Sequence, residues 1–287
     1  MENKETVLVT GGSGFIGSHC IIQLASAGYN VKATVRDLSR TNKLNQILLT
    51  GLEKHEGKSD LSVDWQVANL SSDEGWEEAV KGCDYVLHVA SPIGMELPKN
   101  EDEMVKPAVE GTLRVLKAAS KAGVKRVVIT SSVAAIMYGT DKQGVFDEED
   151  WTNPDSKTTN VYAKSKTLAE KAAWDFIEKD SSGMELSTVL PAMVFGPILE
   201  EDFGVSVGAI LDMMNGKYPI VPNWDMGVVD VRDVASLELL AMTRPEAAGK
   251  RFVCSAENMF MKDQNEYLSE IFPESASKIP KRVAPNW

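Results

Sequence analysis

Tyr162 and Lys166 are the two residues of this sequence whose types and spacing best suit acid–base chemistry. They lie four positions apart in the segment YAKSK, so a helix would place both side chains on one face. A tyrosine has a pKa of about 10 and is a poor proton shuttle near neutral pH. We expect the Lys166 ammonium to lower the pKa of Tyr162, so that the tyrosine can exchange a proton with a substrate oxygen.

Two neighbouring serines, Ser131 and Ser132, follow an apolar, β-rich segment that ends at Thr130. Ligands of open α/β sheets bind outside the carboxyl ends of the strands, so hydroxyl groups at this point would face a bound ligand. A serine there can donate a hydrogen bond to a carbonyl oxygen and stabilise the charge that develops on it. Serines at the end of a strand also serve as turn formers, and both roles stay open at this point.

A glycine-rich turn follows the first β-rich segment, residues 6–10. Gly11 permits a tight turn, Gly14 lets backbone N–H groups approach a pyrophosphate, and Gly17 lets the next helix pack against the strand. The pyrophosphate would lie at the positive N-terminus of that helix. This turn therefore predicts a dinucleotide site inside the first βαβ unit.

The end of the second strand should distinguish the two nicotinamide cofactors. A site for NAD usually has an Asp or Glu about 20 residues after the glycines, where it binds the ribose hydroxyls. Here Val35 occupies the last strand position, Arg36 follows it, and Lys43 lies on the next helix. Two cations suit the 2′-phosphate of NADPH, which we therefore predict as the cofactor. Asp37 keeps NAD possible.

A parallel sheet would bring these residues together, and the chain predicts one, because strand-like segments alternate with helical patterns. The expected strands are residues 6–10, 31–35, 62–67, 84–89, 125–130 and 186–190, and the expected helices include residues 72–81, 101–122 and 161–178.

Beyond residue 190, prolines punctuate the chain, and we expect helices at 205–215 and 231–243 and a return strand at 251–255. The fold class predicted is α/β: a Rossmann-type doubly wound parallel sheet with a smaller C-terminal substrate lobe. The dinucleotide-binding domain would comprise residues 1–190 with a return segment at about 225–257. The substrate lobe would comprise residues 191–224 and 258–287.

The composition is that of an ordinary soluble globular protein, with 287 residues, 43% of them hydrophobic, and a formal net charge of −12. An acidic chain is poorly suited to nonspecific binding of nucleic acid. Cys20, Cys83 and Cys254 are far apart and predict neither a disulfide framework nor a metal site. The sequence has no signal peptide and no membrane span, so we expect a cytoplasmic protein without membrane or nucleic-acid partners.

Seven segments together resemble the extended short-chain dehydrogenases/reductases, and within them the dihydroflavonol reductase-like branch. That branch includes cinnamoyl-CoA reductases and microbial aldehyde or ketone reductases. The resemblance runs from about Val7 to Ser255. The segments are TGGSGFIG at residues 10–17, TVRD at 34–37, HVASP at 88–92, EMVKPAVEGT at 103–112, TSS at 130–132, YAKSK at 162–166 and LPAMVFGP at 190–197.

The resemblance implies an NADPH-dependent reductase of a small-molecule carbonyl compound. It assigns Tyr162 as the proton donor, Lys166 as its pKa-lowering partner and a ribose ligand, and Ser132 as the group that orients the carbonyl. The cofactor contacts that it and the glycine turn imply are Gly11, Gly14, Phe15, Ile16, Gly17, Arg36, Lys43, Asn69, Leu70, Val89, Ala90, Ser91, Tyr162, Lys166, Pro191 and Val194.

The sequence also departs from this branch. Met137 stands where plant dihydroflavonol reductases usually have an Asn or Asp that binds flavonoid hydroxyls, so we expect an apolar or small carbonyl substrate. Trp224 and Met226 are candidates for the apolar walls of the substrate pocket, beside Ser132 and Tyr162. Family members commonly continue past the position of Trp287, so we expect part of the pocket to differ here.

Two other interpretations remain. A nucleotide-sugar epimerase or dehydratase would use the same scaffold and tyrosine, but it would retain NAD and usually has an acidic residue after the second strand. A redox-sensing regulator would bind NADP without reacting and typically lacks the Tyr–Lys pair. The oligomeric state expected is monomer or homodimer.

Overall fold

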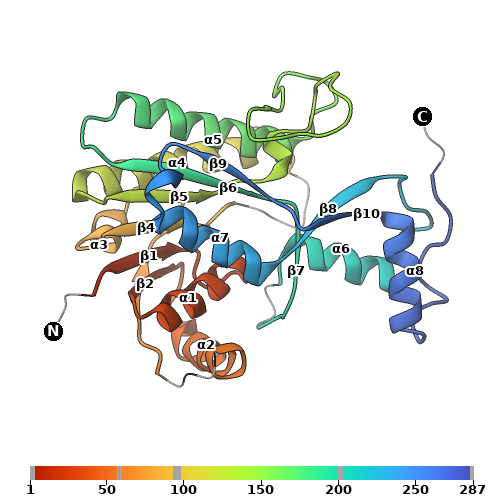
Figure 1. Ribbon diagram of the computed structural model, residues 1–287, viewed down its shortest axis with the longest axis horizontal. Coiled ribbons are helices and arrows are strands. Elements are labelled where there is room, and N and C mark those ends of the chain that lie inside the picture. The colour runs from red at the N-terminus through yellow and green to blue at the C-terminus, as the bar shows by residue number, and fades with distance from the viewer. Residues whose placement is uncertain (1–3, 57, 59, 93–97, 200–202, 285–287) are drawn as a thin grey trace.

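The architecture is a seven-stranded parallel sheet covered by helices on both faces, seen in a computed structural model (Figure 1). The structure describes residues 4–56, 58, 60–92, 98–199 and 203–284. The strand order is β3-β2-β1-β4-β5-β6-β9, so the direction of sheet growth reverses between β1 and β4. The strands are β1 Thr6–Thr10, β2 Asn30–Val35, β3 Val63–Val67, β4 Tyr85–His88, β5 Arg126–Thr130, β6 Glu185–Pro191 and β9 Arg251–Cys254. The predicted doubly wound α/β fold is confirmed.

Each face of the sheet has its own apolar core. One core lies under α1 (Phe15–Ala27), α2 (Thr41–Glu56) and α7 (Val231–Thr243). The other lies under α3 (Trp76–Val80), α4 (Asp102–Ala122) and α5 (Val161–Lys179). Because both faces are covered, the central strands are apolar on both sides, and every residue of β5 is buried.

Glycines end or delay several of these helices. Gly28 ends α1 in the left-handed conformation, with φ of 90°. The helix expected over residues 72–81 is shorter, and α3 begins only at Trp76. Gly75 is the reason: its φ is +87°, and a Cβ there would lie 2.1 Å from the carbonyl oxygen of Val67. The chain turns at Gly75 before the helix can start.

A second, three-stranded sheet lies at the other end of the molecule, to the right in Figure 1. Its order is β10-β8-β7, from Glu257–Phe260, Asp225–Asp230 and Met193–Phe195. The sequence placed residues 225–257 together as a return segment, but within that range only β9 joins the central sheet. The helices α6 (Gly204–Met214) and α8 (Met261–Ile271) lie beside the small sheet. β7 and β10 have only three and four residues, and such short strands leave little periodicity to detect.

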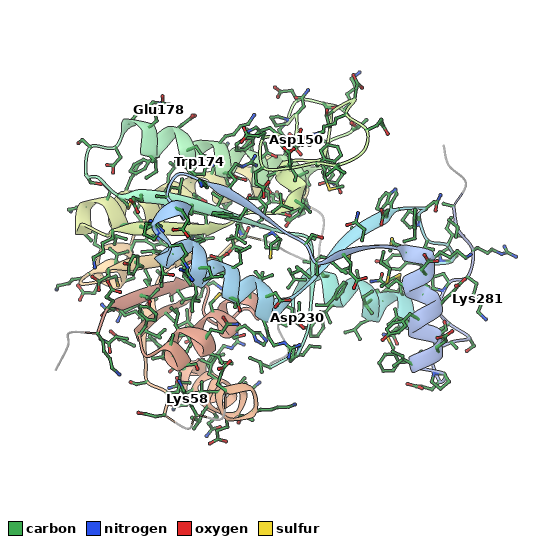
Figure 2. All side chains as sticks on the ribbon, in the orientation of Figure 1. Lys58, Asp150, Trp174, Glu178, Asp230 and Lys281 are labelled. Carbon is green, nitrogen blue, oxygen red and sulfur yellow. The ribbon has the colours of Figure 1, made fainter. Side chains whose placement is uncertain are left out.

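The small sheet and the central domain meet where β8 runs directly into α7. Asp230, labelled at this junction in Figure 2, caps α7 by accepting a hydrogen bond from the Arg232 N–H at 2.8 Å. Within the described residues, no helix is both long enough and apolar enough to cross a membrane.

Candidate active site

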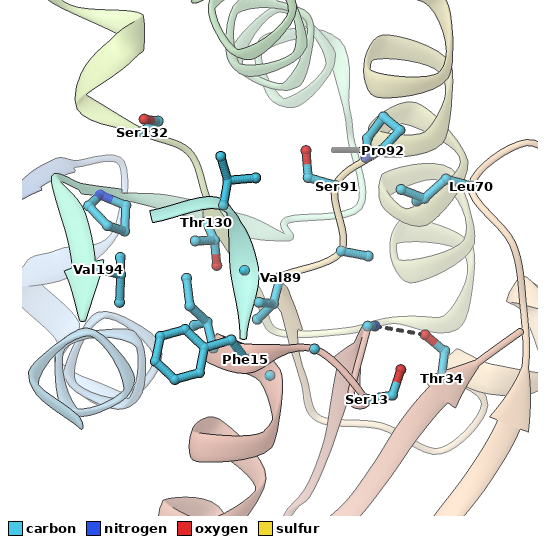
Figure 3. A pocket seen from close by; sticks show the side chains of 18 of the residues that line it. Ser13, Phe15, Thr34, Leu70, Val89, Ser91, Pro92, Thr130, Ser132 and Val194 are labelled. Atoms are coloured by element: carbon cyan, nitrogen blue, oxygen red, sulfur yellow. Dashed lines mark hydrogen bonds between the residues drawn. The ribbon is translucent and has the colours of Figure 1, made fainter. Parts of the chain in front are cut away.

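A cavity of about 610 Å³ opens at the carboxyl ends of the central strands, where the strand order reverses between β1 and β4. This is the point at which open α/β sheets bind their ligands. Residues distant in the sequence line it, and Leu70 and Val194 lie at opposite sides in Figure 3. All of the predicted cofactor contacts line this cavity except Lys43, which is exposed on α2.

The glycine turn forms the floor of the cavity. Gly11 has a φ of +67°, and a Cβ at this residue would lie 3.0 Å from the Cα of Ala90. A Cβ at Gly17 would lie 2.3 Å from the carbonyl oxygen of Gly11, so no larger residue fits. Gly14 precedes α1 and has no side chain to cap it, which leaves the first N–H groups of the helix available to an anion. The turn therefore fits a pyrophosphate.

Two charged residues, Arg36 and Asp37, follow β2, and they differ in whether they line the cavity. Arg36 is exposed and lines the cavity. Asp37 does not line it, because its carboxylate accepts hydrogen bonds from the Ser39 N–H at 2.8 Å and the Ser39 hydroxyl at 2.6 Å. These bonds hold the pKa of Asp37 below its usual value. Asp37, the residue that kept NAD possible in the sequence, thus has its carboxylate engaged in hydrogen bonds within a local turn.

Asn69 and Leu70 form the wall after β3. The side chain of Asn69 accepts a hydrogen bond from the Ser71 N–H at 3.0 Å, and its carbonyl oxygen accepts one from Trp76 Nε1 at 3.3 Å. A Cβ at Gly111 would lie 2.8 Å from the Cβ of Leu70, so α4 packs closely behind this wall. These contacts fix both predicted residues where they line the cavity.

A buried polar pair fixes the segment after β4. Thr10 Oγ1 is 2.8 Å from His88 Nδ1 and also accepts a hydrogen bond from the Ala90 N–H at 3.0 Å. Burial lowers the pKa of His88 to about 3, and the nearby charge of Lys166 acts in the same direction. His88 is therefore neutral and positions Val89, Ala90 and Ser91 rather than exchanging protons.

The predicted Tyr–Lys pair lies on the first turns of α5. Asn160 begins this helix by accepting a hydrogen bond from the Ala163 N–H at 2.9 Å. Tyr162 is half-buried at the cavity wall, and Lys166 is 7% exposed. The Lys166 Nζ donates to the carbonyl oxygen of Thr130 at 3.1 Å. Burial lowers the pKa of Lys166 to about 8, opposed by the charges of Glu170 and Glu238.

Ser132 completes a cluster with this pair. Its hydroxyl oxygen accepts a hydrogen bond from the Ala134 N–H at 3.1 Å, which leaves its hydrogen free to point into the cavity. Burial raises the pKa of Tyr162, and a hydrogen bond with Ser132 opposes that rise. The effect of Lys166 on the pKa of Tyr162 stays a prediction: here the Lys166 ammonium donates to the Thr130 carbonyl oxygen, and Ser132 opposes the rise in the pKa of Tyr162.

The remaining predicted substrate residues lie outside the lining of the cavity. Met137 is exposed on the segment after β5, and Trp224, 60% exposed, precedes β8. Met226 lies within β8 opposite Met259 of β10.

The structure instead adds Phe203, Gly204, Val205 and Ser206 at the start of α6, which the sequence did not single out. The sequence feature that could have indicated them is Gly204, a glycine directly before an apolar segment. In the structure this glycine forms a turn with φ of +76°.

The cavity thus combines an open helix N-terminus, a cation beside the strand end and a Ser132–Tyr162–Lys166 cluster. No group of three or more metal-ligating side chains occurs among the residues that could be described. The fold and this cavity define the class of Rossmann-type dinucleotide-binding proteins.

Comparison with known proteins gives the family. The model of the NAD dependent epimerase/dehydratase family matches residues 7–255. The dihydroflavonol 4-reductase of Zea mays is 34% identical over 291 residues, covering 98% of this chain and 78% of the maize protein. The cinnamoyl-CoA reductase CAD2 of Medicago truncatula is 35% identical over 285 residues, covering 97% and 83%. The yeast methylglyoxal/isovaleraldehyde reductase Gre2, solved with NADPH, has a TM-score of 0.80 at 30% identity, covering 96% of this chain and 85% of that one.

The chain belongs to the NAD dependent epimerase/dehydratase family. Within it, the chain is an extended short-chain dehydrogenase/reductase of the dihydroflavonol reductase-like branch, which confirms the resemblance described above.

Proposed function

We propose that this protein is an NADPH-dependent carbonyl reductase that converts an aldehyde or ketone to an alcohol. It is an NADP-dependent oxidoreductase, consistent with the reductases named among its relatives. The observation that carries the proposal is the placement of Ser132, Tyr162 and Lys166 on the wall of one cavity with the glycine turn. Either group alone has other uses, but together they supply a cofactor site and a proton donor.

The bound cofactor supplies a hydride to the carbonyl carbon. The residues of this chain act on the carbonyl oxygen of the substrate. Ser132 donates a hydrogen bond that polarises the carbonyl and stabilises the negative charge that develops on its oxygen. Tyr162 then donates the proton of its hydroxyl group to that oxygen. The Lys166 ammonium stabilises the resulting phenolate, since a cation nearby favours the charged form of an acid.

Selectivity for NADPH over NADH rests on Arg36 in this proposal. Arg36 lines the cavity, and a guanidinium binds a phosphate through two parallel hydrogen bonds. Asp37, the carboxylate that would select the ribose hydroxyls of NAD, is held by Ser39. Lys43 remains a candidate for a longer-range contribution to the same phosphate.

The wider assignments follow the same proposal. We assign residues 1–190 with a return segment at about 225–257 to cofactor binding, and residues 191–224 and 258–287 to a substrate lobe. The three cysteines are free and buried, as is usual in a reducing compartment, so we place the enzyme in the cytoplasm. We propose that it is a monomer or a homodimer. Met137, Trp224 and Met226 stay candidates for substrate contacts made when a substrate is bound.

The test is oxidation of NADPH by the purified protein in the presence of aldehydes, α-ketoesters and aryl ketones, with NADH as the comparison cofactor. We expect carbonyl-dependent consumption of NADPH and slower consumption of NADH. Stoichiometric binding of NADPH without consumption across the panel would contradict the proposal in favour of a regulator. Co-purification of tightly bound NAD would contradict it in favour of an epimerase or dehydratase.

A further inference from the structure

Glu238 is a buried carboxyl group that the proposed reaction does not use. It lies on α7, in the middle of the helix face formed by Val231, Val234, Ala235 and Met242, and it is 0% exposed. One carboxyl oxygen, Oε1, accepts a hydrogen bond from Thr130 Oγ1 at 2.6 Å. The other, Oε2, has no hydrogen-bond partner among the described residues. A buried acceptor without a partner is costly, so its presence calls for a physical reason.

Thr130 connects Glu238 to the active site. It is the last residue of β5, and its carbonyl oxygen accepts the hydrogen bond from Lys166 Nζ at 3.1 Å. The helices α7 and α5 lie on opposite faces of the central sheet (Figure 1), and Thr130, at the end of β5, lines the cavity (Figure 3). Thr130 therefore links the two groups: its hydroxyl donates to the Glu238 carboxyl, and its carbonyl oxygen accepts from the Lys166 ammonium.

The other buried carboxyl near Lys166 already has a cation. Glu170 Oε1 accepts a hydrogen bond from Arg251 Nε at 2.7 Å, and it also accepts one from Thr188 Oγ1 at 2.9 Å. Its second oxygen accepts from Ser131. Glu170 is buried, and the Arg251 side chain, 9% exposed, forms an ion pair with it. Glu238 has no such pair within the described part of the chain, so the ammonium across Thr130 is the charge available to it.

The other titratable groups that face this pair do not supply a charge. The thiols of Cys20 on α1 and Cys254 on β9 have pKa values raised first by burial and then by the Glu238 charge, so both stay neutral. His88 on β4 is neutral near physiological pH because burial lowers its pKa to about 3. The Glu170–Arg251 pair has no net charge. The electrostatic partner of Glu238 is therefore Lys166.

We propose that Glu238 is a positioning residue of the catalytic centre, the buried counter-charge that acts on Lys166 through the sheet by way of Thr130. This inference rests on the proposed reductase function, in which Lys166 stabilises the Tyr162 phenolate.

The consequence concerns the pH at which Lys166 loses its proton. Burial lowers the pKa of Lys166 to about 8, and the charges of Glu170 and Glu238 oppose this. Burial raises the pKa of Glu238 to about 7, and Thr130 and Lys166 oppose that rise. Removing the Glu238 carboxylate takes away one of the two charges that oppose the burial of Lys166, so the pKa of Lys166 should fall. A nearby opposite charge typically changes a pKa by about 1 unit or more.

The first experiment measures Lys166 directly and needs no turnover. NMR titration of the lysine ε-carbons gives the pKa of Lys166 in the full chain, with the resonance assigned by its loss in Lys166→Met. In Glu238→Gln, which keeps the shape and the acceptor for Thr130, we expect the pKa of Lys166 to fall by about 1 unit. Asp233→Asn removes an exposed carboxylate from the same helix and should leave the pKa unchanged. An unchanged pKa in Glu238→Gln would overturn the inference even if reductase activity is present.

The second experiment compares pH profiles of carbonyl reduction. In Glu238→Gln, the decline of kcat/KM at alkaline pH should begin about 1 pH unit lower than in the wild type, with near-wild-type rates at lower pH. A rate lowered equally at every pH would indicate a merely structural role and would overturn the inference. If Glu238→Gln fails to fold, Glu238→Met provides the same test, because it removes both the charge and the unpartnered oxygen at similar volume.

Discussion

Ser131 and Ser132 are neighbours in the chain, but their hydroxyl groups have different partners. The Ser131 hydroxyl donates to the buried carboxylate of Glu170, so its hydrogen is already engaged. The Ser132 hydroxyl oxygen accepts a hydrogen bond from the Ala134 N–H, so its hydrogen can be donated on the cavity side, where the hydroxyl also forms a hydrogen bond with Tyr162. A single peptide unit thus separates a hydroxyl engaged by a buried carboxylate from one that can donate into the cavity.

Replacing the two serines by alanine should separate these roles. In Ser132→Ala, kcat should fall about 100-fold or more, as expected for loss of a donor to a developing oxyanion, while NADPH affinity stays the same. In Ser131→Ala, Glu170 loses a partner, so stability should drop by about 1 kcal/mol with kcat affected much less. Steady-state kinetics and thermal unfolding of both variants are the measurements. Equal losses of kcat would contradict the assignment.

Gly17→Ala and Gly14→Ala are a matched pair for the glycine turn. A Cβ at Gly17 would overlap the Gly11 carbonyl oxygen at 2.3 Å, so the backbone must shift; we expect a lower melting temperature and loss of NADPH binding. A Cβ at Gly14 would be 3.4 Å from the same oxygen, an ordinary contact. Gly14→Ala should therefore keep its melting temperature but bind NADPH more weakly, because its methyl group points where the pyrophosphate must approach. Calorimetry and fluorescence titration test both variants.

Arg36→Leu should weaken NADPH binding while leaving NADH binding nearly unchanged. Charge-assisted hydrogen bonds contribute about 1.5–3 kcal/mol, so the expected loss is about 10-fold to 100-fold in affinity. Lys43→Ala, on a residue outside the cavity lining, should produce a smaller loss. Titration of both cofactors against each variant gives the ratios. Equal losses for NADPH and NADH would show that Arg36 does not contact the 2′-phosphate.

The wild-type rate of carbonyl reduction should decline as the pH rises through about 8, where Lys166 loses its proton. The sign follows from the mechanism: the ammonium is present below this pH and absent above it, so stabilisation of the phenolate is lost on the alkaline side. Tyr162 does not cause this limb, because its pKa is raised and its hydroxyl stays protonated there. A kcat/KM profile across neutral and alkaline pH tests this, and a rate that rises through the same range would contradict it.

Much of the central sheet was predictable because its elements carry strong local patterns. The strands β1 and β5 are continuous apolar runs. In α5, the capping residue Asn160 and the Tyr–Lys face lie within a few residues of each other in the sequence. The same is true of the glycine turn, whose residue types are fixed by contacts as close as the one at Gly17. Here local sequence and final structure agree.

The parts that sequence reasoning missed depend on contacts between distant segments. The small sheet pairs β7 with β8 across more than thirty residues, and β7, with three residues, is too short to show a period of two. Glu238 was overlooked as well. A lone carboxyl on the apolar face of α7 could have indicated a buried polar group, but its partner Thr130 lies 108 positions away in sequence.

The central claim is that Tyr162 donates the proton in an NADPH-dependent carbonyl reduction, and Tyr162→Phe tests it most directly. The substitution removes one oxygen and keeps the ring, so the cavity and the glycine turn are preserved. Turnover of a carbonyl compound that the wild type reduces should be abolished, while NADPH binding, followed by fluorescence titration, stays nearly intact. Substantial residual turnover with intact NADPH binding would contradict the account.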